Sequence, residues 1–98
     1  MKLSYTENKI LRKLAILNIK RDTTLSSIAV QLQISRTNMT FCHIIKVLFE
    51  SNIFELKNTI GKTKIIAINN TLLQDLIESQ PDYDEFSDYA AKFKIYSD

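Results

Sequence analysis

The hydrophobic pattern of this chain changes its period from about 3.6 to 2 near Asn52. Before that point, apolar residues recur about every 3.6 positions in three successive stretches, which predicts three helices. After it, residues 53–57 and 63–68 are rich in strand formers, and residues 58–62 between them hold the only glycine, Gly61. Two such stretches joined by a short loop with glycine predict a β-hairpin. Three helices followed by a hairpin indicate an α+β fold.

Short motifs predict where the helices begin and end. Ser4 to Glu7 form the pattern of a capping box, in which the serine hydroxyl and the glutamate carboxylate each pair with a free backbone N–H. The first helix is therefore expected to run from there to about Lys20. Thr24 is expected to cap the second helix, and the third is expected to end near Ser51.

The start of the third helix is less well determined. Counting forward from the second helix makes Ser35 its cap, whereas counting back from its own end makes Thr37 the cap. A fourth helix is expected from Asn70 or Thr71, and Pro81 should end or kink it. The residues expected to be buried in the four helices are Ile10, Leu11, Leu14, Ala15, Leu17, Ile28, Ala29, Leu32, Phe41, Ile44, Ile45, Leu48, Leu72, Leu73, Leu76 and Ile77.

Charge is divided unevenly along the chain. Residues 1–69 hold eleven lysines and arginines and four acids, a net charge of +7, whereas residues 70–98 hold two lysines and seven acids, a net charge of −5. This asymmetry indicates a basic working surface and an acidic element that faces elsewhere. A chance distribution of solvated charges is the alternative.

The order helix, helix, tight connection, helix, hairpin is that of a winged helix-turn-helix domain. Residues 25–37 resemble the helix-turn-helix of winged-helix transcription regulators, including the multiple-antibiotic-resistance and arsenic-repressor types. Residues 48–54 resemble their third-helix exit, and residues 61–66 their basic wing tip and second strand. Asn52 stands where the family usually has glycine, and asparagine is the next best residue for a left-handed helix end. The residues that carry the first similarity are Leu25, Ile28, Ala29, Leu32, Ile34, Ser35, Arg36 and Thr37.

The resemblance implies a DNA-binding domain over residues 1–80, with the start of the third helix in the major groove of duplex DNA. Arg36 would pair with guanine or a phosphate and Asn38 with adenine, while Lys46 would be solvated or touch a phosphate rather than read a base. Lys57, Lys62 and Lys64 around the hairpin would contact phosphates or enter the minor groove. Capping is the alternative role of the hydroxyls, and keeping a hairpin edge soluble is that of the lysines. The candidate base-reading residues are Ser35, Arg36, Thr37, Asn38, Thr40 and His43.

Cys42 and His43 are the only cysteine and the only histidine. Two ligands are too few for a zinc site, and adjacent helical residues point about 100° apart, which does not suit a catalytic pair. We expect no metal, no cofactor and no enzymatic activity, with Cys42 as a buried thiol and His43 at the surface or facing DNA. A single cysteine, no signal peptide and no long apolar run indicate a cytoplasmic protein without a membrane span.

Residues 81–98 carry aromatic residues at helical spacing, flanked by acids. This stripe could pack on the first helix of its own chain or on a second copy, and we expect it to form a homodimer. The expected function is binding of double-stranded DNA by a homodimeric transcriptional regulator. The alternatives are a plasmid or viral partition, replication-control or architectural DNA-binding protein, and a winged-helix protein-interaction module. The stripe consists of Tyr83, Phe86, Tyr89, Ala90, Phe93 and Tyr96.

Overall fold

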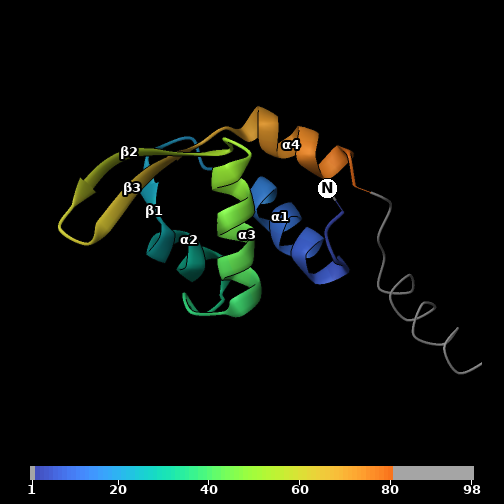
Figure 1. The fold of residues 1–98 in the computed structure, drawn as a ribbon, viewed down its shortest axis with the longest axis horizontal. Helices are drawn as coiled ribbons and strands as arrows, with labels where there is room; N and C mark the ends of the chain where they lie inside the picture. The colour runs from blue at the N-terminus through green and yellow to red at the C-terminus, as the bar shows by residue number, and fades with distance from the viewer. Residues whose placement is uncertain (1, 81–98) are drawn as a thin grey trace, which may run out of the picture.

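A computed structural model describes residues 2–80 of the chain, and these form four helices and a three-stranded antiparallel sheet (Figure 1). The expected α+β class is confirmed. The expected break or helix end at Pro81 and the aromatic stripe at 81–98 lie outside the described residues. The elements in chain order are α1 (Tyr5–Leu17), β1 (Thr23–Thr24), α2 (Leu25–Leu32), α3 (Met39–Glu50), β2 (Phe54–Ile60), β3 (Thr63–Ile68) and α4 (Asn70–Glu78).

Helix α1 begins with the expected capping box. The Glu7 backbone N–H donates to the Ser4 hydroxyl, and the Ser4 N–H donates to the Glu7 carboxylate, each at 3.1 Å. The helix is shorter than predicted and ends at Leu17 rather than near Lys20. Asn18 takes the left-handed conformation (φ 47°) there, and its N–H bonds to the Ala15 carbonyl, which closes the last turn.

Strand β1 was not predicted from the sequence. Its two residues pair with the middle of β3, Thr23 with Ile66 and Thr24 with Ile65, so that β3 is the central strand of the sheet. A strand of two residues is too short to show an alternating pattern. Thr24 also caps α2 as predicted, since its hydroxyl accepts the Ser27 N–H at 3.1 Å.

The core lies between α1, α2 and α3 and is closed by the sheet and α4 (Figure 1). The predicted faces of α2 and α3 are buried. In α1, Leu11 and Leu14 are buried and Ile10 packs partly against the core. In α4, Leu73 and Ile77 are buried, but Leu72 is 38% exposed, contrary to prediction. The confirmed buried residues of α2 and α3 are Ile28, Ala29, Leu32, Phe41, Ile44, Ile45 and Leu48.

The hairpin begins directly after α3. Asn52 ends that helix in the left-handed conformation (φ 61°), as predicted. Phe54, the first residue of β2, meets the ring of Phe49 edge to face at 5.6 Å between centroids, which fixes the root of the hairpin on α3. The far end of the hairpin projects beyond the helices (Figure 1).

The hairpin turn is tighter than the predicted loop of residues 58–62. The strands continue to Ile60 and restart at Thr63, which leaves only Gly61 and Lys62 in the turn. Gly61 has a positive φ of 61° and Lys62 does not, the pattern of a type II′ turn with glycine first.

Helix α4 is capped by Asn69, not by Asn70 or Thr71 as predicted. The Asn69 side-chain oxygen accepts the Leu72 N–H at 3.0 Å. Asn70 instead donates its amide to the Ile19 carbonyl at 2.8 Å, and so holds α4 against the segment after α1. None of the helices within residues 2–80 is long and apolar enough to cross a membrane.

Candidate nucleic-acid interface

The connection between α2 and α3 presents a short exposed segment to solvent. Ile34 is half-buried, and its N–H bonds to the Ala29 carbonyl at 3.0 Å, which anchors the connection to the end of α2. The hydroxyls of Ser35 and Thr37 lie 2.9 Å apart and share a hydrogen bond. Both residues are exposed, as is Arg36 between them. The segment is therefore open to solvent, but it precedes the third helix and does not form its start.

Helix α3 begins later than either predicted position. Asn38 is its cap, because the Asn38 side-chain oxygen accepts the Phe41 N–H at 3.0 Å. Ser35 and Thr37 belong to the preceding turn, where the Ser35 carbonyl also accepts the Asn38 N–H at 3.0 Å. A two-bond contact to adenine would need this same side-chain oxygen of Asn38, which already accepts the capping hydrogen bond from Phe41. Asn38 therefore has a structural role as the cap of α3.

The outer face of α3 follows from this later start. Met39, the first helical residue, is 88% exposed, and Lys46 is also exposed, while Thr40 is half-buried. Cys42 is exposed rather than buried as predicted, and its thiol points to the Arg36 carbonyl at 3.6 Å. The thiol lies outside the core because residue 42 follows the buried Phe41 by about 100° around the helix.

His43 connects this outer face to α1. Its Nδ1 atom lies within hydrogen-bond distance of the Glu7 carboxylate, and 58% of the His43 side chain remains exposed. Partial burial alone would raise the pKa of Glu7. The hydrogen bonds with Ser4, together with the smaller effects of His43, outweigh it and lower that pKa below its ordinary value. His43 therefore lies at the surface, as predicted, but is held by a carboxylate.

Arg36 shares a cleft of about 240 Å³ with two lysines of the hairpin, Lys62 and Lys64. The cleft is completed by the start of α2, where the first backbone N–H groups have no acceptor within the helix. Among the described residues that line it are three cations and no carboxylate. Three of the predicted site residues, distant in sequence, thus meet at one strongly basic concavity. The full lining is Thr24, Leu25, Ser26, Arg36, Lys62, Thr63 and Lys64.

A β-bulge in β2 determines which side chains of the hairpin lie on the same side of the sheet as this cleft. Leu56 pairs with Ile66, but two residues later Asn58 pairs with Ile65, so Lys57 is the extra residue. Alternation along β3 places Lys64 on the same face of the sheet as the buried Ile66, toward the helices. The bulge shifts β2 by one residue against it, so that Thr59 rather than Asn58 stands opposite Lys64.

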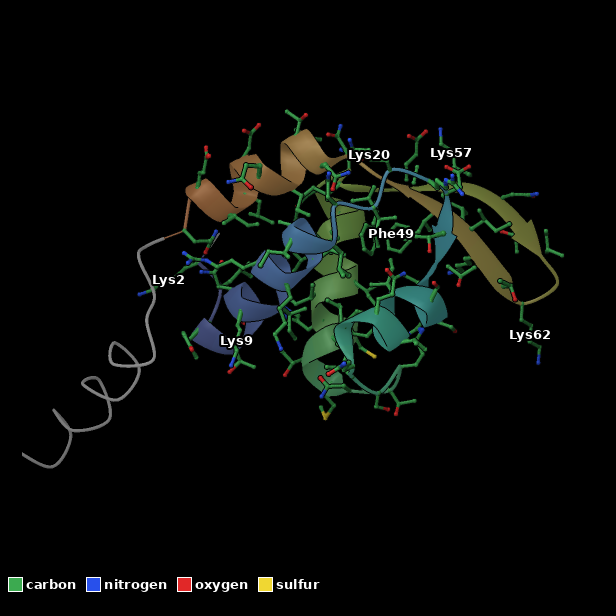
Figure 2. The ribbon with its side chains drawn as sticks, turned by 180° about the vertical axis from the view of Figure 1, so that it is seen from behind. Lys2, Lys9, Lys20, Phe49, Lys57 and Lys62 are labelled. Carbon is green, nitrogen blue, oxygen red and sulfur yellow. The ribbon has the colours of Figure 1, made fainter. Side chains whose placement is uncertain are left out.

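Two other predicted residues lie apart from the cleft. Lys57 forms an ion pair with Glu55 at 3.5 Å and does not line the cleft, and Figure 2 shows it well separated from Lys62 at the turn. Lys46 lies further along α3, on the exposed face. Sequence reasoning missed Ser26 and the first turn of α2 as part of the site. The cap at Thr24 was the available signal, because it already located an exposed helix start.

Comparison with models of known protein families and with curated proteins found no match to this chain. Within residues 2–80, no cluster of three or more histidines, cysteines, aspartates or glutamates has the arrangement of a metal site.

Proposed function

We propose that this protein has a winged helix-turn-helix domain that binds double-stranded DNA and acts as a transcriptional regulator. The order of α2, a tight connection, α3 and a protruding hairpin supports this fold assignment. In it, α3 is the recognition helix and the β2–β3 hairpin is the wing.

The observation that carries the proposal is the convergence of Arg36, Lys62 and Lys64 on one cleft beside the start of α2. A phosphate placed there would meet three positive charges and the partial positive charge of a helix N-terminus. Lysine and arginine contacts to phosphates supply most of the sequence-independent affinity of DNA-binding proteins. The cleft therefore suits a backbone phosphate rather than a base edge.

Base reading in this proposal falls to the exposed face of α3. Met39, His43 and Lys46 stand on this face, beyond the turn that holds Arg36. Thymine methyl groups are apolar partners for Met39, and the free edge of the His43 ring can donate to or accept from a base. Seating the phosphate in the cleft fixes the register of this face in the major groove.

A gel-retardation assay with a library of random duplexes at two salt concentrations tests the proposal. Binding should weaken steeply with salt, with a slope near −0.9 for each phosphate neutralised. The triple variant Arg36→Ala, Lys62→Ala, Lys64→Ala should lose most of this binding. Absence of binding at low salt, or a slope near zero, would reject the proposal.

The matched control removes the same charge from another face. Lys9, Arg12 and Lys13 are exposed on α1, and Figure 2 shows Lys9 far from Lys62. Replacing these three residues by alanine should leave most of the affinity intact. Equal losses in the two triple variants would mean that net charge, and not the cleft, determines binding. Footprinting then separates a single operator from a repeated partition array or from uniform coating.

A further inference from the structure

Helices α1 and α4 leave a hollow of about 550 Å³ between them, on a part of the surface that the basic cleft does not include. Its walls come from α1 and from α4 with the residues just after it. They combine three apolar side chains with four polar or charged ones, among them the cation Arg12 on α1 and the carboxylate Glu78 on α4. The lining residues are Arg12, Ala15, Ile16, Gln74, Ile77, Glu78 and Gln80.

Ile16 is the unusual residue of this hollow. Its side chain is 81% exposed, although it belongs to the most apolar stretch of α1. It also borders a second hollow of about 240 Å³ on its other side, where Leu17 and Leu32 contribute apolar surface. Ile16 therefore forms an apolar ridge between two concavities, and the walls of these concavities add apolar surface to it. A contiguous apolar patch of this kind is a candidate for cover by a further segment of protein.

The described part of the chain ends at the wall of the larger hollow. Gln80 is buried, and its side-chain oxygen accepts the Leu3 N–H at 2.9 Å, while its amide donates to the Leu76 carbonyl at 3.4 Å. These bonds fix Gln80 beside the start of α1 and the end of α4. The residues that follow therefore leave from the edge of the hollow, whichever way they continue.

The sequence of residues 81–98 is complementary to this surface. Its aromatic residues recur at helical spacing and need an apolar partner. Its first half carries Asp82, Asp84, Glu85 and Asp88 without a basic residue. On α1, Lys9, Arg12, Lys13 and Ile16 recur at helical spacing, so exposed cations flank the apolar ridge.

We propose that residues 81–98 dock in the α1–α4 hollow of their own chain, with the aromatic stripe covering Ile16 and the acidic half facing the cations of α1. The sequence left two partners open for this stripe, the first helix of the same chain and a second copy, and the sequence-based expectation was the second copy. The anchored position of Gln80 favours the first, because the segment starts at the hollow. This inference does not depend on DNA binding.

Thiol reactivity in the full-length chain tests the proposal. Cys42 is first replaced by serine, which removes the only native thiol. Ile16→Cys is then added, and its alkylation rate by iodoacetamide is measured with the native stripe and with Tyr83, Phe86, Tyr89 and Phe93 all replaced by serine. We expect alkylation to be several-fold slower with the native stripe. The control is Lys62→Cys at the hairpin turn, which should be alkylated at the same rate in both backgrounds.

The mass of the native-stripe protein is measured by sedimentation at the same concentrations. Slow, stripe-dependent alkylation in a species of one chain supports the proposal. Equal rates for Ile16→Cys in the two backgrounds would overturn it, as would protection found only in a two-chain species, which would assign the hollow to a second copy. If the serine variant does not fold, an Ile16→Cys rate as high as that of Lys62→Cys in the native-stripe chain overturns the proposal by itself.

Discussion

Arg36 and Lys64 line the same cleft, although one lies in the connection between α2 and α3 and the other in the central strand of the sheet. The described residues that line this cleft include no carboxylate, so the two cations repel each other. That arrangement is stable at low cost only where solvent or an anion screens it. Both side chains are exposed, so solvent screens them here, and in the proposed DNA complex a backbone phosphate would take this role.

Replacing either member of this pair should weaken DNA binding and lower the magnitude of the salt slope. Arg36→Ala and Lys64→Ala should each reduce the slope by about one, as expected for one lost phosphate contact. If both side chains contact the same phosphate, the double variant should lose less than the sum of the single losses, with a coupling energy of about 0.5–3 kcal/mol. Titration of a fixed duplex at four salt concentrations measures both quantities.

Lys57→Ala is the control for these variants. It removes the same charge from the same hairpin, but Lys57 pairs with Glu55 and does not line the cleft. Its slope should change less than that of Lys64→Ala. A larger effect of Lys57→Ala would place the DNA on the other part of the hairpin.

The cap of α3 can be tested by its contribution to stability. Asn38→Ala removes the side-chain oxygen that accepts the Phe41 N–H, so the free energy of unfolding should fall by about 0.5–2 kcal/mol. Asn38→Ser should retain most of the stability, because serine is an equally good cap. Urea denaturation measures these differences.

The same series distinguishes the three candidate caps. Ser35→Ala and Thr37→Ala should cost less than Asn38→Ala, because their hydroxyls bond to each other in an exposed turn. A greater loss for either of them would contradict the start of α3 at Met39.

The sequence alone predicts the core of α2 and α3 correctly, because the buried faces follow from helical periodicity and need no long-range information. Ile28 and Leu32 lie one turn apart in α2, as do Ile44 and Leu48 in α3, and all four are buried. The exposure of Cys42 follows from the same rule, since a helix that buries both Phe41 and Ile44 turns the residue next to Phe41 outward. The buried thiol was predicted from the usual burial of cysteine, whereas the helical positions of Phe41 and Ile44 place Cys42 on the outer face.

The start of α3 could not be predicted by such local rules. Ser35, Thr37 and Asn38 are all residues that cap helices well, and the spacing between α2 and α3 decides among them. The bond from Ile34 to Ala29 closes the end of α2 and sets that spacing. The sequence predicted which residues would form the candidate site, but it could not predict which of them would line one cleft. The bulge in β2 and the meeting of Arg36 with Lys64 depend on contacts between distant segments.

The hairpin turn should be sensitive to the backbone conformation of Gly61 and not to the space around it. A side chain at this position would meet no atom within 4 Å, but the positive φ of 61° is unfavourable for residues with a Cβ. Gly61→Ala should therefore lower the free energy of unfolding by about 1–2 kcal/mol. Gly61→Asn should cost less, since asparagine tolerates this conformation better. Thermal unfolding measures the difference, and equal losses for the two variants would contradict the argument.

The Glu7 carboxylate should make stability depend on pH in the acid range. Its native pKa is lowered from the ordinary 4.5, so the unfolded chain binds the proton more readily. The stabilising contribution is therefore complete above pH 4.5 and is lost as the pH falls through the lower native pKa. Glu7→Gln keeps a capping-box side chain without the charge. The difference in unfolding free energy between the native protein and this variant should shrink over that range.

Glu55→Gln serves as the comparison for this pH series, because Glu55 is exposed and only pairs with Lys57. Exposed ion pairs of this kind contribute little to stability, so its difference from the native protein should stay small at every pH. A Glu7→Gln difference that is constant with pH would mean that the carboxylate acts through shape alone. A difference that shrinks with acid would show that its negative charge, held by Ser4 and His43, joins the start of α1 to the outer face of α3.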